Sequence, residues 1–303
     1  MSDHIIVILG PTATGKSDLA VKIAHIFNGE IISADSRQIY KGLDIGTGKI
    51  TMDEMQGIKH YCIDLIEPFQ RFTVVDWQTK AKQAINEIRN KGKLPIICGG
   101  TGFYIESIVN NTLFPELKSD QKKFEGLSKE QLLEELNKLD PESAKTVDKD
   151  NLRKVKRALE LAQQYGHVPK LSKSKPLGRF ILVGIQFPDR ELRQRINDRL
   201  MKRMDQGMIE EAQGLTSGKI LGKPLSYKKM DELGLEYRYL AQYLLGKLNK
   251  EQFINTLGTK IWQYARRQKT WWRRMNNIEW FGNPQVENNM NDIIDYIKDK
   301  LNE

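Results

Sequence analysis

Short apolar runs alternate with helical patterns along the first third of the chain. The apolar runs span residues 5–9, 30–34, 61–66 and 94–98. Their length and composition are typical of strands that are buried on both faces. Between them, residues 16–27 and 73–93 repeat apolar positions every three or four residues, which predicts amphipathic helices. This alternation predicts βαβ units around a parallel sheet, and therefore an α/β fold.

The pattern changes after residue 112. Ser128 precedes a helical segment and Gln131 follows three residues later, an arrangement typical of a capping box at a helix start. More helical pattern and then a basic stretch rich in Lys, Pro and Ser follow. We therefore predict a helical insertion over residues 113–179 that ends in a flexible basic loop. The α/β core is predicted to comprise residues 1–112 and 180–303.

The chain returns to the sheet with the apolar run 180–187, and the remainder is predicted to be helical. Two long amphipathic helices are expected at 191–212 and 249–274. Their inward positions are Leu192, Ile196, Leu200, Met204, Ile209 and Ala212 in the first, and Phe253, Leu257, Ile261 and Tyr264 in the second. The second helix also carries three tryptophans, Trp262, Trp271 and Trp272. They either pack in the core or stack on nucleic-acid bases.

Composition excludes several classes of protein. The 303 residues are 39% hydrophobic, which is enough to bury a core. No apolar run reaches the length of a membrane span, and no basic-then-apolar leader precedes residue 5, so we expect a cytoplasmic protein with no membrane partner. Cys62 and Cys98 are too few for a disulfide framework or a four-ligand zinc site. The histidines lie far apart, at His4, His25, His60 and His167.

The net charge of +9 is unevenly distributed. Residues 1–110 are neutral, with 12 basic and 12 acidic side chains. Residues 150–200 hold 12 basic and 5 acidic side chains, and residues 260–275 hold basic side chains without any acid. Clusters of this kind suit a polyanionic partner such as nucleic acid, because each neutralised phosphate releases counterions. The alternative is a solvated basic helix face.

A phosphate-binding loop follows the first predicted strand. Gly10, Gly15, Lys16 and Ser17 match the pattern G-x-x-x-x-G-K-[ST] and open the first predicted helix. The glycines let backbone N–H groups point at phosphate oxygens, and the helix N-terminus adds partial positive charge. Lys16 would contact the outer phosphates and Ser17 would bind Mg²⁺. Such loops hold ATP or GTP in many proteins, so the motif alone does not identify the reaction.

Two further strand ends carry polar or glycine-rich segments. Asp35 follows the second strand, at the edge where open α/β sheets bind ligands. It is a candidate base or metal-linked acid, or else a helix cap. A glycine-rich segment follows the next long strand, where Thr101 is surrounded by Gly99, Gly100 and Gly102. These glycines either let the backbone approach a ligand closely or form a structural turn. The chain has no N-K-x-D motif, which disfavours a GTPase.

These motifs together resemble the tRNA dimethylallyltransferase family, also called tRNA isopentenyltransferases, in its bacterial form. The resemblance covers about residues 4–280 and is carried by GPTATGKS, ISADSRQIYKGLDIGTGK, CGGTGFY, RKVKRALE and QYARRQKTWWRR. It implies a fold similar to P-loop nucleotide kinases with an insertion that grips the anticodon stem of tRNA. It also implies transfer of a dimethylallyl group from dimethylallyl diphosphate to N6 of adenosine-37, just 3′ of the anticodon, with Mg²⁺ as cofactor.

The resemblance assigns roles to matching residues. The diphosphate would be bound by Gly10, Pro11, Thr12, Ala13, Thr14, Gly15, Lys16 and Ser17, with Mg²⁺ on Ser17. Lys16, Asp35, Thr101 and Arg238 would form the catalytic set, with Asp35 as the base toward N6 and Arg238 directed at the diphosphate. The implied tRNA-contacting residues are Asp35, Ser36, Arg37, Gln38, Thr101, Arg153, Lys154, Val155, Lys156, Arg157, Gln263, Arg266 and Arg267. Trp262 stands where the family commonly has arginine.

Two other functions stay open at this point. A relative of the family would prenylate free adenine nucleotides, but the basic segments argue against so small an acceptor. A P-loop kinase or nucleic-acid-binding ATPase would use the same loop for ATP. For the favoured function we expect a monomeric transferase.

Overall fold

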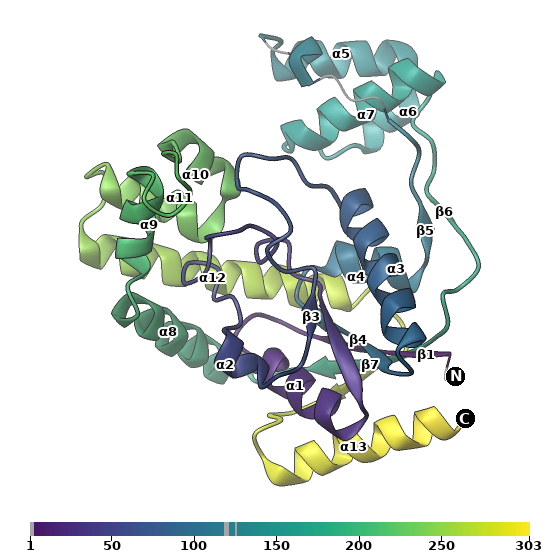
Figure 1. Ribbon diagram of the computed structural model, residues 1–303. Coiled ribbons are helices and arrows are strands. Elements are labelled where there is room, and N and C mark those ends of the chain that lie inside the picture. The colour runs from purple at the N-terminus through teal and green to yellow at the C-terminus, as the bar shows by residue number, and fades with distance from the viewer. Residues whose placement is uncertain (1–2, 118–120, 125) are drawn as a thin grey trace. The chain divides into compact units, whose positions relative to one another are not determined.

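The larger part of the chain is built on a parallel sheet in a computed structural model, which describes residues 3–117, 121–124 and 126–303 (Figure 1). Over these residues the main sheet has six strands in the order β3-β2-β4-β1-β7-β8, and every pairing is parallel. The strands are β1 (His4–Leu9), β2 (Gly29–Ser33), β3 (His60–Tyr61), β4 (Leu94–Gly99), β7 (Arg179–Ile185) and β8 (Ile278–Phe281). The predicted α/β fold is confirmed.

Helices cover both faces of this sheet because its central strand β1 is apolar and fully buried over residues 5–9. In β1, Ile6 and Ile8 pack in one core cluster together with residues of α1, α8 and α13, whereas Ile5 and Val7 pack in a second cluster with α3 and α4. Figure 1 shows α1 and α13 on one side of the sheet and α3 and α4 on the other. The helices of this part are α1 (Lys16–Ile26), α2 (Met52–Met55), α3 (Val74–Asn90), α4 (Gly102–Val109), α8 (Asp189–Asp205), α9 (Met208–Thr216), α10 (Tyr227–Leu233), α11 (Leu235–Leu244), α12 (Lys250–Trp272) and α13 (Glu287–Asn302).

The chain divides into two compact units. The larger one contains the residues up to Asn110 and Pro176–Glu303, and the smaller one is Asn111–Lys175; the sequence analysis placed the insertion at 113–179. The smaller unit contains β5 (Thr112–Leu113), a 3-10 helix (Gln121–Phe124), α5 (Lys129–Leu139), α6 (Pro141–Thr146), α7 (Leu152–Tyr165) and β6 (Ser172–Lys173). The strands β5 and β6 pair antiparallel, so the two ends of the unit lie side by side.

The capping box predicted in this smaller unit is confirmed. The Ser128 hydroxyl accepts a hydrogen bond from the backbone N–H of Gln131, and the Gln131 side chain accepts one from the N–H of Ser128. Leu132, Leu136 and Leu159 are fully buried in the core between α5 and α7. The unit therefore has a hydrophobic core of its own.

Three sequence predictions about elements of the larger unit are wrong. The strand predicted at 61–66 is reduced to two residues, because Cys62 and Asp64 adopt positive φ values of 61° and 51°, which end a strand. The C-terminal part is not entirely helical, since β8 adds a parallel edge strand beside β7. The helix predicted at 191–212 is split into α8 and α9 at Gly207, which has a φ of 95°.

No helix in the described part of the chain is long and apolar enough to cross a membrane.

A polar network stabilises the sheet near its β3 edge. The buried Glu30 carboxylate accepts hydrogen bonds from Lys93 Nζ at 2.8 Å, Lys91 Nζ at 3.1 Å and the Tyr61 hydroxyl at 2.8 Å. Burial alone would raise the pKa of Glu30, but these hydrogen bonds outweigh it and hold the pKa below its ordinary value of 4.5. The ionised carboxylate therefore contributes to folding stability.

We predict that Glu30→Gln lowers the free energy of unfolding by about 2 kcal/mol at neutral pH, because charge-assisted hydrogen bonds are lost. Since the folded-state pKa is below 4.5, this stabilisation is present above that value and disappears as pH falls through the folded-state pKa. Urea unfolding of both proteins should therefore show the difference shrinking below about pH 4. A difference that stays constant into acid would contradict the prediction.

Candidate functional site

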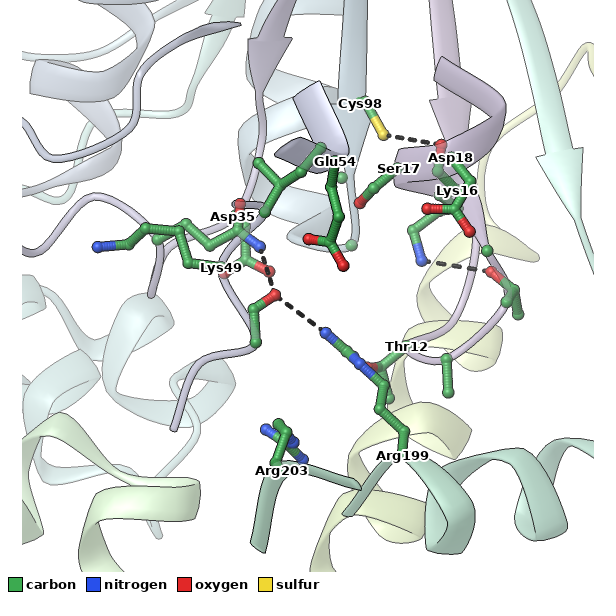
Figure 2. A pocket seen from close by; sticks show the side chains of 18 of the residues that line it. Thr12, Lys16, Ser17, Asp18, Asp35, Lys49, Glu54, Cys98, Arg199 and Arg203 are labelled. Carbon is green, nitrogen blue, oxygen red and sulfur yellow. Dashed lines mark hydrogen bonds between the residues drawn. The ribbon is translucent and has the colours of Figure 1, made fainter. Parts of the chain in front are cut away.

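A pocket of about 720 Å³ lies at the carboxyl ends of β1, β2 and β4 (Figure 2). Its walls come from residues 12–18, from Ser33, Asp35 and Gln38, from the loop 44–54, from the end of β4, and from one face each of α8 and α12. In a doubly wound sheet the loops after two neighbouring strands can leave toward opposite faces, as after β1 and β4 here, and this opens a crevice in which ligands bind. The phosphate-binding loop and Asp35, which are distant in sequence, line the same space.

The phosphate-binding loop leads from β1 to α1 as predicted. Gly10 has a φ of 147°, and a Cβ at that position would lie 2.4 Å from the Ile185 carbonyl oxygen, so only glycine fits. Gly15 adopts the left-handed region with a φ of 78° and directs the chain into α1. Thr12 to Ser17 line the pocket, whereas Gly10 and Pro11 are not among the lining residues.

Lys16 lies inside the pocket with neutral partners. Its ammonium group donates hydrogen bonds to the Pro11 carbonyl oxygen and, at 3.3 Å, to Thr14 Oγ1. Burial of this charge lowers the pKa of Lys16 to about 8. Nearby Cys98 is buried, which raises the pKa of its thiol to about 12 and leaves it un-ionised at neutral pH. The pocket therefore presents a cation that no internal carboxylate neutralises at ion-pair distance among the described residues.

Oxygen groups beside Lys16 fit a hard cation. Ser17 is exposed to the pocket, and Asp18, Asp35 and Glu54 line the same space (Figure 2). Within the described ranges no three His, Cys, Asp or Glu side chains come close enough to form a metal cage. This donor set suits Mg²⁺, which keeps several waters and binds proteins through few groups plus substrate phosphates.

Asp35 begins a tight turn rather than a helix. Its Oδ1 accepts the backbone N–H of Arg37 at 2.8 Å, and Asp35 faces the pocket. Thr101 Oγ1 accepts the N–H of Ser36 at 3.0 Å. Thr101 is not among the pocket-lining residues. It therefore positions the turn that carries Asp35 instead of forming the wall, which differs from the sequence prediction.

Helix α8 contributes three arginines that the sequence analysis did not single out. Arg195, Arg199 and Arg203 recur every four residues and all line the pocket. The apolar positions Leu192 and Ile196 of the same helix are buried, which turns the arginine face toward the phosphate-binding loop. The sequence could have indicated this arginine face, because the three arginines are spaced at i, i+4 and i+8 along one predicted helix.

Gln268 of α12 joins two of the pocket loops. Its Oε1 accepts the backbone N–H of Thr12 at 2.9 Å, and its Nε2 donates to the Gly100 carbonyl oxygen at 2.8 Å. A Cβ at Gly100 would lie 2.3 Å from Gln268 Nε2, which explains a glycine at this position. Tyr264, expected as a core residue, lies one turn earlier and lines the pocket. Sequence spacing placed Tyr264 on the inward face but could not tell core from pocket, and it did not single out Gln268.

Glu211 of α9 holds the loop on the opposite side of the pocket. Its carboxylate accepts the backbone N–H groups of Asp44 at 2.9 Å, Ile45 at 2.6 Å and Gly46 at 2.9 Å. The Tyr237 hydroxyl donates a further hydrogen bond at 2.7 Å. Because the carboxylate is buried and fully hydrogen-bonded, it fixes this backbone segment firmly.

The structure does not bring every predicted residue to the pocket. Arg238 is half-exposed, pairs with Asp231 at 2.9 Å and is not among the pocket-lining residues, so its role toward the diphosphate stays a prediction. Ser36 and Arg37 stand outside the lining, whereas Gln38 lines the pocket. The carboxylate of Asp231 in α10 forms an ion pair with the guanidinium of Arg238 in α11. The sequence motif does not reveal this contact between two helices.

The implied RNA-contacting residues separate by exposure. In α7, Arg153 and Lys154 are exposed, but Val155 is fully buried in the core of the smaller unit, so its side chain cannot contact RNA. Two further α7 side chains are partly buried, Lys156 and Arg157. On α12, the exposed ones are Gln263, Arg266 and Arg267. Of the three tryptophans there, Trp272 is buried in the core.

The fold and the pocket define a P-loop protein of the doubly wound α/β type, with cations gathered around the loop. The model of the IPP transferase family matches residues 38–275. A tRNA dimethylallyltransferase of Thermoanaerobacter sp. (strain X514) is 39% identical, with 100% of both chains covered. The chain therefore belongs to the IPP transferase family.

Solved structures agree with this assignment. The full-length tRNA isopentenylpyrophosphate transferase of Bacillus halodurans has a TM-score of 0.74 and 32% identity, covering 99% of this chain and 97% of that chain. A eukaryotic dimethylallyltransferase described as acting on tRNA has a TM-score of 0.79 and 26% identity, covering 93% of this chain and 74% of that chain. The resemblance inferred from the motifs is confirmed.

We predict that Gln268→Glu destabilises the protein by about 1–3 kcal/mol, because an oxygen then replaces the donor Nε2 and faces the Gly100 carbonyl. Gln263→Glu, the same change at an exposed position of α12, should stay within about 0.5 kcal/mol of wild type. Chemical unfolding of the two variants measures both values. Equal stabilities would show that Gln268 does not hold the loops together.

Proposed function

We propose that this protein transfers a dimethylallyl group from dimethylallyl diphosphate to N6 of adenosine-37 in tRNA and releases diphosphate. The observation that carries the proposal is the convergence of the phosphate-binding loop and Asp35 in one pocket. A phosphate cradle beside a carboxylate suits an alkyl transfer in which a weak nucleophile is deprotonated while an anionic group leaves. Family membership and the names of the relatives support the same reaction. Since tRNA is the acceptor, we place the activity in the cytoplasm.

The proposed reaction balances within this pocket. The N6 nitrogen forms a bond to the first carbon of the dimethylallyl group, and the bond from that carbon to the diphosphate oxygen breaks. Its electron pair leaves with the diphosphate, where Lys16 and the backbone N–H groups of residues 13–17 offset the growing negative charge. N6 loses a proton to Asp35, whose Oδ1 is already oriented by the N–H of Arg37.

Mg²⁺ is the proposed cofactor. Ser17 is placed to hold it together with phosphate oxygens, with Asp35 and Glu54 lining the same space. When bound, the ion would supply additional positive charge to the diphosphate.

A polyanionic acceptor is supported by the exposed basic side chains. Arg266 and Arg267 of α12 belong to the segment 260–275, which contains no acid, and both are exposed. In the smaller unit, Arg153 and Lys154 are likewise exposed on α7. Free adenine nucleotides would not need these surfaces, whereas the phosphates of a tRNA anticodon stem-loop would.

The decisive assay incubates the purified protein with unmodified tRNA, labelled dimethylallyl diphosphate and Mg²⁺, and then analyses the nucleosides. The expected product is N6-dimethylallyladenosine at the position just 3′ of the anticodon. Parallel reactions with AMP as acceptor and with ATP as the only nucleotide distinguish the two rival functions. Label on AMP alone, or phosphate release from ATP without prenyl transfer, would overturn the proposal.

We predict that Asp35→Asn lowers the single-turnover rate by about 10²–10⁴-fold, because a positioned general base is removed. Asparagine retains the Oδ1 acceptor for the Arg37 N–H, so the turn and the affinities for tRNA and diphosphate should change only a few-fold. If Asp35 only caps the turn, the asparagine variant will react within about twofold of wild type.

Affinity for tRNA should depend strongly on salt. We predict a decrease of about tenfold or more between about 50 and 200 mM salt, because several phosphates are neutralised. Charge reversal at Arg266 and Arg267 together should flatten the slope of log affinity against log salt, whereas reversal at the exposed Lys298 of α13, outside the basic segments, should leave it unchanged. Filter binding over a salt series measures the slopes. An affinity that does not vary with salt is incompatible with this prediction.

A further inference from the structure

A groove separate from the phosphate pocket lies between α8 and α12, which pack against each other (Figure 1). It has a volume of about 370 Å³ and is lined by Trp262 of α12 and by residues of α8, namely Asp189, Arg190, Arg193, Gln194 and Asn197. None of these residues lines the phosphate pocket, although α8 contributes to both sites. The two sites therefore use different faces of α8, and the groove is large enough to hold a ligand of its own.

Trp262 is the aromatic side chain of this groove. The sequence left two roles open for the tryptophans of α12, which were core packing and base stacking. Trp272 is buried in the core, and Trp271 packs against the backbone of Gly102. Trp262 is only partly buried, and among the described residues no aromatic ring stacks on it and no cation lies over it. Its indole is therefore available to a ligand in the groove.

The charge around Trp262 is positive. Arg190 and Arg193 are exposed, and within the described part of the chain neither forms an ion pair with a carboxylate. The acidic residue of the lining, Asp189, is already paired with Lys269 Nζ at 2.5 Å. Arg266 lies one turn after Trp262 on α12 and is also exposed. An accessible indole between guanidinium groups suits a ligand that combines a flat ring with negative charge.

We propose that this groove binds one unpaired nucleotide of the tRNA anticodon loop, other than the target adenosine, and this inference rests on the proposed function. The base stacks on Trp262, and the adjacent backbone phosphates contact Arg190 and Arg193. A nucleotide is favoured over an acidic peptide because it uses both the ring and the cations, and because Arg266 connects the groove to the basic segment 260–275.

A second anchored base has a clear use in the proposed reaction. The target adenine must leave its stack to reach Asp35, and this costs unstacking energy. A neighbouring base that stacks on Trp262 offsets part of this cost and keeps the loop in one position while the reaction occurs. Because every base has a flat face, this anchor would accept different bases at the same loop position.

The test is a double-mutant cycle between the protein and the RNA. In an anticodon stem-loop RNA, each loop base except the target adenine is replaced in turn by an abasic nucleotide, and filter binding at fixed salt measures the affinity. With the wild-type protein, one abasic position should weaken binding about fivefold or more, as expected when one stacked base is lost. Trp262→Leu keeps an apolar side chain without a ring, so it should bind the intact RNA more weakly by a similar factor and lose its sensitivity to that position. Trp262→Phe keeps a ring and should retain part of both.

Two controls separate base stacking from a general loss of structure or charge. Calorimetry with inorganic diphosphate and Mg²⁺ should give the wild-type affinity for Trp262→Leu, because the groove and the phosphate pocket share no lining residue. The double variant Arg190→Gln/Arg193→Gln should bind the RNA more weakly and with a flatter salt dependence, but it should remain sensitive to the same abasic position.

The inference is overturned if no abasic position weakens wild-type binding by more than about twofold, or if the loss is the same in Trp262→Leu as in wild type. If Trp262→Leu does not fold, as judged by thermal unfolding, Trp262→Met decides in its place by the same criterion. A protein that binds the RNA through this groove but transfers no dimethylallyl group refutes the proposed function alone. Transfer to tRNA without any sensitive loop position overturns the groove inference alone.

Discussion

The pocket depends on positive charge that the protein does not neutralise itself. Lys16 and Arg199 point into the space beside the phosphate-binding loop, and their hydrogen-bond partners are carbonyl and hydroxyl oxygens. A carboxylate at either position would form an ion pair and compete with an anionic ligand. Burial of the two charges lowers their pKa values, to about 8 for Lys16 and about 10 for Arg199. Much of the surrounding structure serves to hold these two groups in place.

That support comes from segments far apart in the chain. Gln268 of α12 connects the backbone of the phosphate-binding loop to Gly100, and Glu211 of α9 binds three successive N–H groups of the loop 44–46. Both side chains are buried, and Glu211 also accepts a hydrogen bond from the Tyr237 hydroxyl. Because backbone segments held in this way have little freedom, the acceptor atoms around Arg199 are pre-organised before a ligand binds. The rigidity of the site is therefore a property of the helical C-terminal half as much as of the sheet.

The two parts of the site differ in how far they can be predicted from the sequence. The phosphate-binding loop is local, because its glycines, lysine and serine act within a few residues of one another between β1 and α1. Asp35 could be placed at the same edge, since the carboxyl ends of parallel strands meet there. The arginines of α8 could not be assigned, because helical spacing shows which side chains share a face but not what that face meets. The same limit explains Arg238, where the motif suggested a ligand and the structure shows a pair with Asp231.

The sequence by itself determined the α/β class, the phosphate-binding loop, the capped helix at Ser128 and, through its combined motifs, the family. These features rest on periodicity, local backbone requirements and short spacings, which act within one or two elements. Only the tertiary structure decided that β8 joins the sheet, that Val155 is buried and that Arg199 faces the phosphate loop. Such outcomes depend on which surfaces pack together, because the same residue is a ligand contact or a core contact according to its neighbours. For this protein, the kind of chemistry is encoded locally, whereas the set of charges that performs it is assembled by the fold.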